Sequence, residues 1–167
     1  MISLRIRGFL LDRENMPIVV LADETGRLTL PVWIGPAEAS AIIVELEGIR
    51  PPEPLTHDLL AGMFTRHGCR LVRLEITGQP GVCPYAARLV YRQGLRRHAL
   101  PARVSDGLAL AVRLGAPILA AEELLAAFPG LPGLLASLRQ GELSRGLSFL
   151  NISAEQAQRT PTRATFN

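Results

Sequence analysis

The sequence contains no lysine, and all 18 of its cationic residues are arginines. Because genome composition alone produces such a bias, the bias by itself predicts no nucleic-acid partner. Cysteine is scarce: Cys69 and Cys83 form neither a C-x-x-C pair nor a zinc-finger spacing, so we expect buried free thiols. The apolar runs are far shorter than the roughly 18 to 20 residues of a membrane-spanning helix, and the alternating N-terminus interrupts a secretory signal. These absences predict a cytoplasmic protein without a membrane segment.

Several catalytic signatures are missing as well. The sequence has no Walker loop, no G-x-G-x-x-G, no G-x-S-x-G and no H-E-x-x-H motif. The enzyme classes that depend on those motifs are therefore disfavoured, and any chemistry rests on polar residues outside them.

What is present fits one globular domain. The chain has 167 residues, of which 48% are hydrophobic and 20% charged, enough to bury roughly two thirds of the unfolded surface. Charge is uneven: residues 1–58 carry five arginines against nine acids, residues 59–105 eight against one, and residues 106–167 five against five. A basic middle beside an acidic first third suits phosphate binding next to carboxylates, although solvated sheet faces give the same pattern.

Hydrophobic periodicity predicts strands in runs of three with helices between them. Strands are expected at residues 2–11, 16–22, 27–33, 70–77, 85–92 and 96–103. Helices are expected at residues 36–47, 56–67, 106–114 and 122–128, with Thr56 and Ser105 as N-caps and with Leu59, Leu60, Met63 and Phe64 as the buried face of the second helix.

This order of elements predicts an α+β fold. We expect a single domain with a mixed, mostly antiparallel sheet of about six strands and three to four helices. The domain is expected at residues 1–128, a peripheral helical extension at 129–157 and a disordered tail at 158–167.

Polar side chains gather where the predicted helices begin. They are Glu38 and Glu45 on the first helix, His57 and Asp58 at the start of the second, and Arg103, Ser105 and Asp106 at the start of the third. Helix capping alone explains Ser105 with Asp106 and Thr56 with Asp58, but it leaves His57 unexplained. The functional interpretation is that the acids hold a divalent cation or position water beside arginines that bind phosphate.

The order of motifs resembles the bifunctional nuclease domain family. The matching strings are LPVWIGPAEA at 30–39, LEG at 46–48, PLTHDLL at 54–60, ARVSD at 102–106, LALA at 108–111 and GAPI at 115–118. Members of that family are small bacterial and plant proteins with an α+β domain that self-associate, and some cleave both DNA and RNA. The chain departs from the family pattern at Pro101, where an acid is common, at Val104 in place of proline, and at Gly107 in place of alanine.

The resemblance implies a nuclease that hydrolyses phosphodiester bonds of DNA or RNA with Mg²⁺ or Mn²⁺. The expected catalytic residues are Asp106, Asp58, His57 and Glu38, and the expected nucleic-acid contacts are Arg103, Arg96, Arg97 and Ser105. The alternative is a non-catalytic dimeric scaffold or nucleic-acid-binding regulator, in which the same residues are caps and ion pairs. A homodimer is expected in either case, formed through the sheet edge or an apolar patch at 131–138.

Overall fold

The computed structural model describes residues 1–133 except residues 13, 80–84, 127, 129 and 131. The described elements, in chain order, are β1 (Ile2–Leu11), β2 (Pro17–Ala22), β3 (Thr29–Trp33), α1 (Pro36–Leu46), α2 (Thr56–Arg66), β4 (Cys69–Thr77), β5 (Ala86–Gln93), β6 (Arg96–Ala102), α3 (Val104–Leu114), β7 (Ile118–Ala120) and α4 (Glu122–Leu125). None of the helices in this part of the chain combines the length and apolar character needed to cross a bilayer.

The strands form one mixed sheet in the order β3-β2-β1-β7-β4-β5-β6. Neighbouring strands are antiparallel except β4 and β7, which are parallel. The expected α+β fold with a mostly antiparallel sheet is therefore confirmed, with one strand more than the six expected. The extra strand, β7, joins the two three-stranded units by pairing with β1 and β4. Three residues carry too little alternation to be recognised as a strand from sequence.

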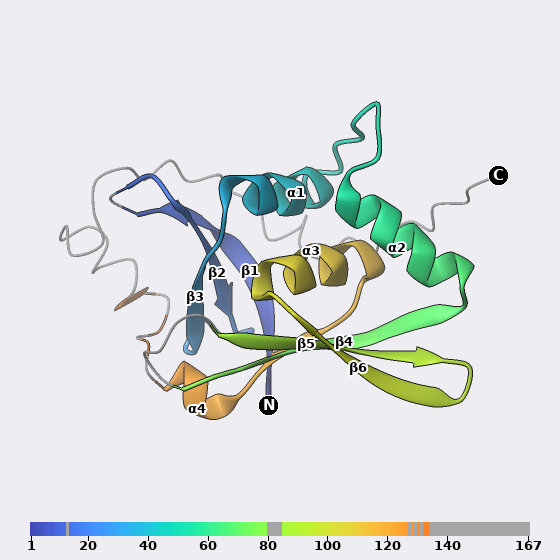
Figure 1. The fold of residues 1–167 in the computed structure, drawn as a ribbon. Helices are drawn as coiled ribbons and strands as arrows, with labels where there is room; N and C mark the ends of the chain where they lie inside the picture. Colours follow the sequence, from blue (N-terminus) through green and yellow to red (C-terminus); the bar gives the residue numbers. More distant parts are fainter. Residues whose placement is uncertain (13, 80–84, 127, 129, 131, 134–167) are drawn as a thin grey trace.

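Helices α1, α2 and α3 lie on one face of the sheet (Figure 1). Helix α3 packs close to β4, because Gly107 faces Leu74: a Cβ at Gly107 would lie 2.5 Å from Leu74 Cδ1. The missing side chain thus allows close packing that offsets the lower helix propensity of glycine. Between these helices and the sheet lies the core, whose fully buried members include Ile42, Leu74, Leu108 and Leu110.

Residues of β4, β5 and β6 alternate between the helix-covered face and the opposite one. Leu74 contacts α3, and it lies opposite Leu89, so both belong to the helix-covered face. Glu75 and its partner Arg88 therefore belong to the opposite face, which we call the outer face.

Four local predictions are corrected by the structure. Leu59, Leu60 and Met63 are 59%, 41% and 55% exposed, so they are not the buried face of α2. Leu55 and Arg103, and not Thr56 and Ser105, occupy the N-cap positions. Helix α4 ends at Leu125, short of residue 128, and Cys69 is a half-buried free thiol and not a fully buried one.

Some expectations lie outside the described residues. These are Cys83, nearly all of the extension at 129–157, the apolar patch at 131–138 apart from residues 132 and 133, and the tail at 158–167.

Candidate functional site

Three acids occupy equivalent positions at the beginning of helices. Glu38 is the third residue of α1, Asp58 the third of α2 and Asp106 the third of α3. A carboxylate in the first turn interacts favourably with the positive end of the helix dipole, which explains the recurrence. The structure places Glu38 and Asp106 in one network and Asp58 in another, and His57 of α2 joins the first.

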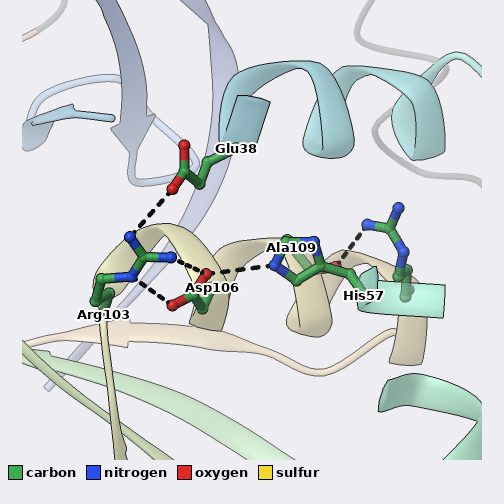
Figure 2. A network of polar contacts seen from close by, with 6 residues as sticks. Glu38, His57, Arg103, Asp106 and Ala109 are labelled. Carbon is green, nitrogen blue, oxygen red and sulfur yellow. Dashed lines mark hydrogen bonds and ion pairs between the residues drawn. The ribbon is translucent and has the colours of Figure 1, made fainter. Parts of the chain in front are cut away.

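Arg103 and Asp106 form the centre of the first network. Arg103 Nε donates to Asp106 Oδ2 over 2.7 Å and its Nη2 donates to Oδ1 over 2.9 Å, a bidentate ion pair. Arg103 Nη1 lies 3.1 Å from Glu38 Oε1. Figure 2 shows Arg103 between Glu38 and Asp106, so the guanidinium connects the first turns of α1 and α3.

Glu38 reaches Arg103 because the turn before α1 leaves room for its carboxylate. A Cβ built on Gly35 would lie 2.3 Å from Glu38 Oε2. Gly35 has an ordinary extended backbone, with φ −73°, so what glycine provides here is space for the Glu38 carboxylate and not a special conformation.

His57 approaches the same aspartate from α2. Its Nε2 lies 3.4 Å from Asp106 Oδ1, and Figure 2 shows the ring pointing along α3 toward that oxygen. The side chains of His57 and Asp106 are 14% and 31% exposed, whereas that of Arg103 is 68% exposed. The network is thus more open to solvent at the arginine than at the histidine.

The charge state of Asp106 follows from these partners. The hydrogen bonds with Arg103 lower the pKa of Asp106 below its ordinary value; partial burial opposes the change, and the contact with His57 adds to it. Asp106 is therefore an anion at neutral pH, able to orient an imidazole beside it.

The second network ties α2 to the last turn of α3. Arg113 Nε donates to Asp58 Oδ1 over 2.6 Å, Arg113 Nη1 donates to the Ala109 carbonyl over 3.1 Å, and the Leu55 N–H donates to Asp58 Oδ2 over 2.7 Å. Burial alone would raise the pKa of Asp58, but the bonds with Arg113 and Leu55 outweigh it, and the net change is downward. Both carboxylate oxygens of Asp58 thus serve to fix the N-terminus of α2.

Arg113 was not identified from the sequence. Its side chain is 3% exposed, and its Nη2 has no hydrogen-bond partner in the described part of the chain. A signal was present: Asp106, Ala109 and Arg113 are spaced by three and four residues, which places all three on one side of a helix. A lone arginine within an apolar run is a sign of a buried ion pair.

The remaining predicted residues lie away from these networks. Arg96 and Arg97 are at the far end of β6, six to seven residues from Arg103, which is roughly 20 Å along a strand. Ser105 is buried, so a nucleic acid on the surface reaches little of its side chain. Glu45 lies 3.5 Å from Arg50 and joins neither network.

Pro101, the position at which the family commonly has an acid, lies away from the Asp106 network. It pairs with Arg88 of β5, so it belongs to the outer face of the sheet. An acid at this position would lie next to Arg88 and not beside Asp106. The departure from the family pattern at Pro101 therefore leaves the network around Asp106 unchanged.

The three acids as arranged do not form a cation site. Asp106 gives both oxygens to Arg103, and Asp58 contacts Arg113, seven residues further along α3, or roughly 10 Å along the helix axis. No group of three or more His, Cys, Asp or Glu residues in the described part of the chain is placed to hold a metal ion. The need for Mg²⁺ or Mn²⁺ stays a prediction.

A further buried carboxylate that the sequence did not single out is Glu75 on the outer face. It forms ion pairs with Arg73, at 2.6 Å, and with Arg88. Burial alone would raise the pKa of Glu75, but the bonds with Arg88 and Arg73 reverse this and lower it.

The lowered pKa of Glu75 predicts a loss of stability in acid. The unfolded state protonates Glu75 near the ordinary pKa of 4.5, whereas the folded state protonates it only at lower pH. The stabilisation that ionised Glu75 gives the fold is therefore complete above about pH 4.5 and is lost as pH falls through the folded pKa. We expect Glu75→Gln to flatten the dependence of unfolding free energy on pH below about pH 4.5, measured by urea denaturation. Glu53→Gln, the same change at an exposed carboxylate, should leave the slope unchanged, and equal slopes in both variants would contradict the assignment.

Comparison with known proteins shows which family the chain resembles. The bifunctional nuclease domain family matches residues 19–129, which include both networks. Two uncharacterized proteins of Mycobacterium tuberculosis, MT1877 and Rv1829, are each 36% identical to the chain over 126 residues, covering 74% of this chain and 74% of the relative. The chain therefore belongs to the bifunctional nuclease domain family.

Proposed function

We propose that the chain cleaves phosphodiester bonds of DNA or RNA at the network of Arg103, Asp106 and His57. The observation that carries the proposal is that a single carboxylate, Asp106, holds an exposed guanidinium and an imidazole at once. These are the two groups that phosphodiester cleavage needs: one to bind the phosphate and one to move a proton. The family description supports nucleic acid as the substrate.

Arg103 is the phosphate-binding residue in this proposal. Three of its five N–H bonds are directed at Asp106 and Glu38, so two remain for a phosphate oxygen. Its exposed side chain lets the substrate approach from solvent, and the carboxylates hold the guanidinium plane in one orientation. The bound guanidinium also stabilises the negative charge that develops on phosphorus oxygens during the reaction.

His57 is the acid–base residue. It accepts the proton of the attacking hydroxyl, which belongs to water or, in RNA, is the 2′-hydroxyl, while the oxygen of that hydroxyl forms a bond to phosphorus. The bond from phosphorus to the leaving oxygen then breaks, and the imidazolium returns a proton to that oxygen. Asp106 fixes the ring and stabilises the imidazolium, as a carboxylate does beside a catalytic histidine.

A second candidate function is supported by the same contacts. Each of the three acids is bonded to an arginine, and Asp58 also to the N–H of its own helix N-cap. Such pairing suits residues that join helices, and the protein would then bind nucleic acid without cleaving it. Cleavage of plasmid DNA and single-stranded RNA by wild-type and Asp106→Ala protein, with Mg²⁺, Mn²⁺ or EDTA, separates the two functions.

The results with EDTA and with Mg²⁺ or Mn²⁺ distinguish metal-independent from metal-dependent cleavage. Activity that persists in EDTA supports chemistry carried by His57, Asp106 and Arg103 alone. Activity that requires Mg²⁺ or Mn²⁺ would mean that the carboxylates exchange their arginine partners for a cation when the substrate binds.

We also propose that the protein self-associates through the exposed face of α2. Leu59, Leu60 and Met63 lie at helical spacing on one side of α2 and are all exposed. A contiguous apolar face on a small protein is typical of an interface.

The variant Met63→Glu tests this surface. We expect it to shift a dimer toward monomer in sedimentation equilibrium, because the dimer would bury an unpaired carboxylate. Met16→Glu, the same change at an exposed methionine before β2, should leave the equilibrium unchanged. A wild-type monomer at all concentrations, or equal behaviour of the two variants, would contradict an interface on α2.

A further inference from the structure

Three arginines lie side by side across the last three strands of the sheet. Arg70 of β4 pairs with Arg92 of β5, and Arg92 pairs with Arg97 of β6. Residues in register on neighbouring strands point to the same face, with Cα atoms roughly 5 Å apart. We call Arg70, Arg92 and Arg97 the arginine row.

The arginine row belongs to the outer face. Tyr91, the neighbour of Arg92, packs edge to face against Phe64 of α2, with ring centroids 5.4 Å apart. Because successive side chains of a strand point to opposite faces, Arg92 points away from α2. Figure 1 shows α2 and α3 on one side of β4, β5 and β6, so the row and the Asp106 network lie on opposite sides of the sheet.

The charge of the row is not neutralised within the described part of the chain. All three side chains are exposed, and no described acid lies within ion-pair distance of them. Residues 59–105 contain a single acid, Glu75, and it is already bonded to Arg73 and Arg88. Like charges directly opposite one another destabilise a sheet, so the arrangement favours an anionic partner.

We propose that the arginine row binds the backbone phosphates of nucleic acid. Guanidinium groups bind phosphate oxygens through two parallel hydrogen bonds. Three of them in register across one face of neighbouring strands match successive phosphates of one chain, whereas a single free phosphate reaches only part of the row. Only the choice of nucleic acid as the ligand rests on the proposed function. The arginine row itself lies outside the Asp106 network and takes no part in bond cleavage.

The test is binding of a fluorescein-labelled single-stranded DNA of 20 nucleotides, followed by fluorescence anisotropy in EDTA at several salt concentrations. For Arg92→Gln/Arg97→Gln we expect at least tenfold weaker binding at low salt. We also expect the slope of log affinity against log salt to fall by about 1.4, because two phosphate contacts on a single strand are lost. Millimolar inorganic phosphate should compete poorly with the DNA. Effective competition would overturn the proposal, because it would show a site for a single phosphate.

The matched control is Arg27→Gln/Arg50→Gln, which removes the same charge from exposed arginines elsewhere. It should bind nearly as tightly as the wild-type protein. An equal loss of DNA affinity in both variants would show a general charge effect and would contradict binding by the arginine row. Unchanged affinity in Arg92→Gln/Arg97→Gln would contradict it as well. Circular dichroism melts confirm that both variants fold, and Arg97→Gln alone serves if the double variant does not.

The outcomes also separate the row from the cleavage site. If wild-type protein binds DNA through the arginine row and never cleaves it, the proposed DNA binding by the row is supported and the proposed cleavage is contradicted. If Arg92→Gln/Arg97→Gln cleaves with unchanged KM and kcat and binds DNA as the wild-type protein does, DNA binding by the arginine row is contradicted and the proposed cleavage is supported.

Discussion

Asp106→Ala is expected to lower the rate of nucleic-acid cleavage at least 100-fold. The substitution removes the bidentate partner of Arg103 and the contact with His57 in one step, so it disturbs phosphate binding and proton transfer together. General acid–base catalysis alone contributes about 10²- to 10⁴-fold. The measurement is the initial rate of cleavage of plasmid DNA and of single-stranded RNA by protein purified identically.

Two further variants assign the loss to its cause. His57→Gln removes the acid–base group and keeps Asp106 with Arg103, so kcat should fall and KM should change little. Asp106→Asn keeps a hydrogen-bonding side chain of the same size and removes its charge, so an imidazolium is no longer stabilised. We expect Asp106→Asn to lose most of the activity that Asp106→Ala loses.

The assay also has a clear contrary result. Contaminating nucleases survive a point substitution, so equal activity in the wild-type and Asp106→Ala preparations would assign the cleavage to a contaminant. No activity in either preparation, with any cation, would leave nucleic-acid binding without cleavage as the function. Ser105 and Asp106 would then be explained by the helix start alone.

Asp58→Ala is expected to destabilise the fold by about 3 kcal/mol, a cost typical of removing one partner of a buried ion pair. The reason lies in Arg113, whose side chain is 3% exposed and which does not lose its charge at accessible pH. Without Asp58 the guanidinium keeps its bond to the Ala109 carbonyl and has no counter-ion there. The measurement is the free energy of unfolding in urea.

A double variant shows whether the unpaired charge causes the loss. Arg113→Met replaces the guanidinium with an apolar side chain of similar length, so Asp58→Ala/Arg113→Met should be more stable than Asp58→Ala. A double variant no more stable than Asp58→Ala would contradict this explanation. It would leave the lost bond to the Leu55 N–H as the main effect.

The fold class was predictable from sequence because it depends on local patterns. Apolar alternation identified β1, and apolar runs bounded by turn residues identified β2 to β6. Glycine and proline at element ends located α1 within one residue of its observed end. Where the pattern was weak the prediction failed, as for the three-residue β7. Helical periodicity identified the apolar residues of α2, but it does not say which of them are covered. Phe64 packs against Tyr91, whereas Leu59, Leu60 and Met63 are exposed in the described chain.

The sequence by itself determined which residue types stand at the helix starts and which family the chain resembles. Its polar candidates Glu38, His57, Arg103 and Asp106 do converge. Arg103 and Asp106 lie at the beginning of α3, and Glu38 and His57 lie at the beginnings of α1 and α2, which pack against α3. Only the tertiary structure decided the partners. It joined Asp58 to Arg113 across 55 residues and separated Arg96 and Arg97 from Arg103. Such contacts depend on the approach of elements distant in the chain, which no local pattern encodes.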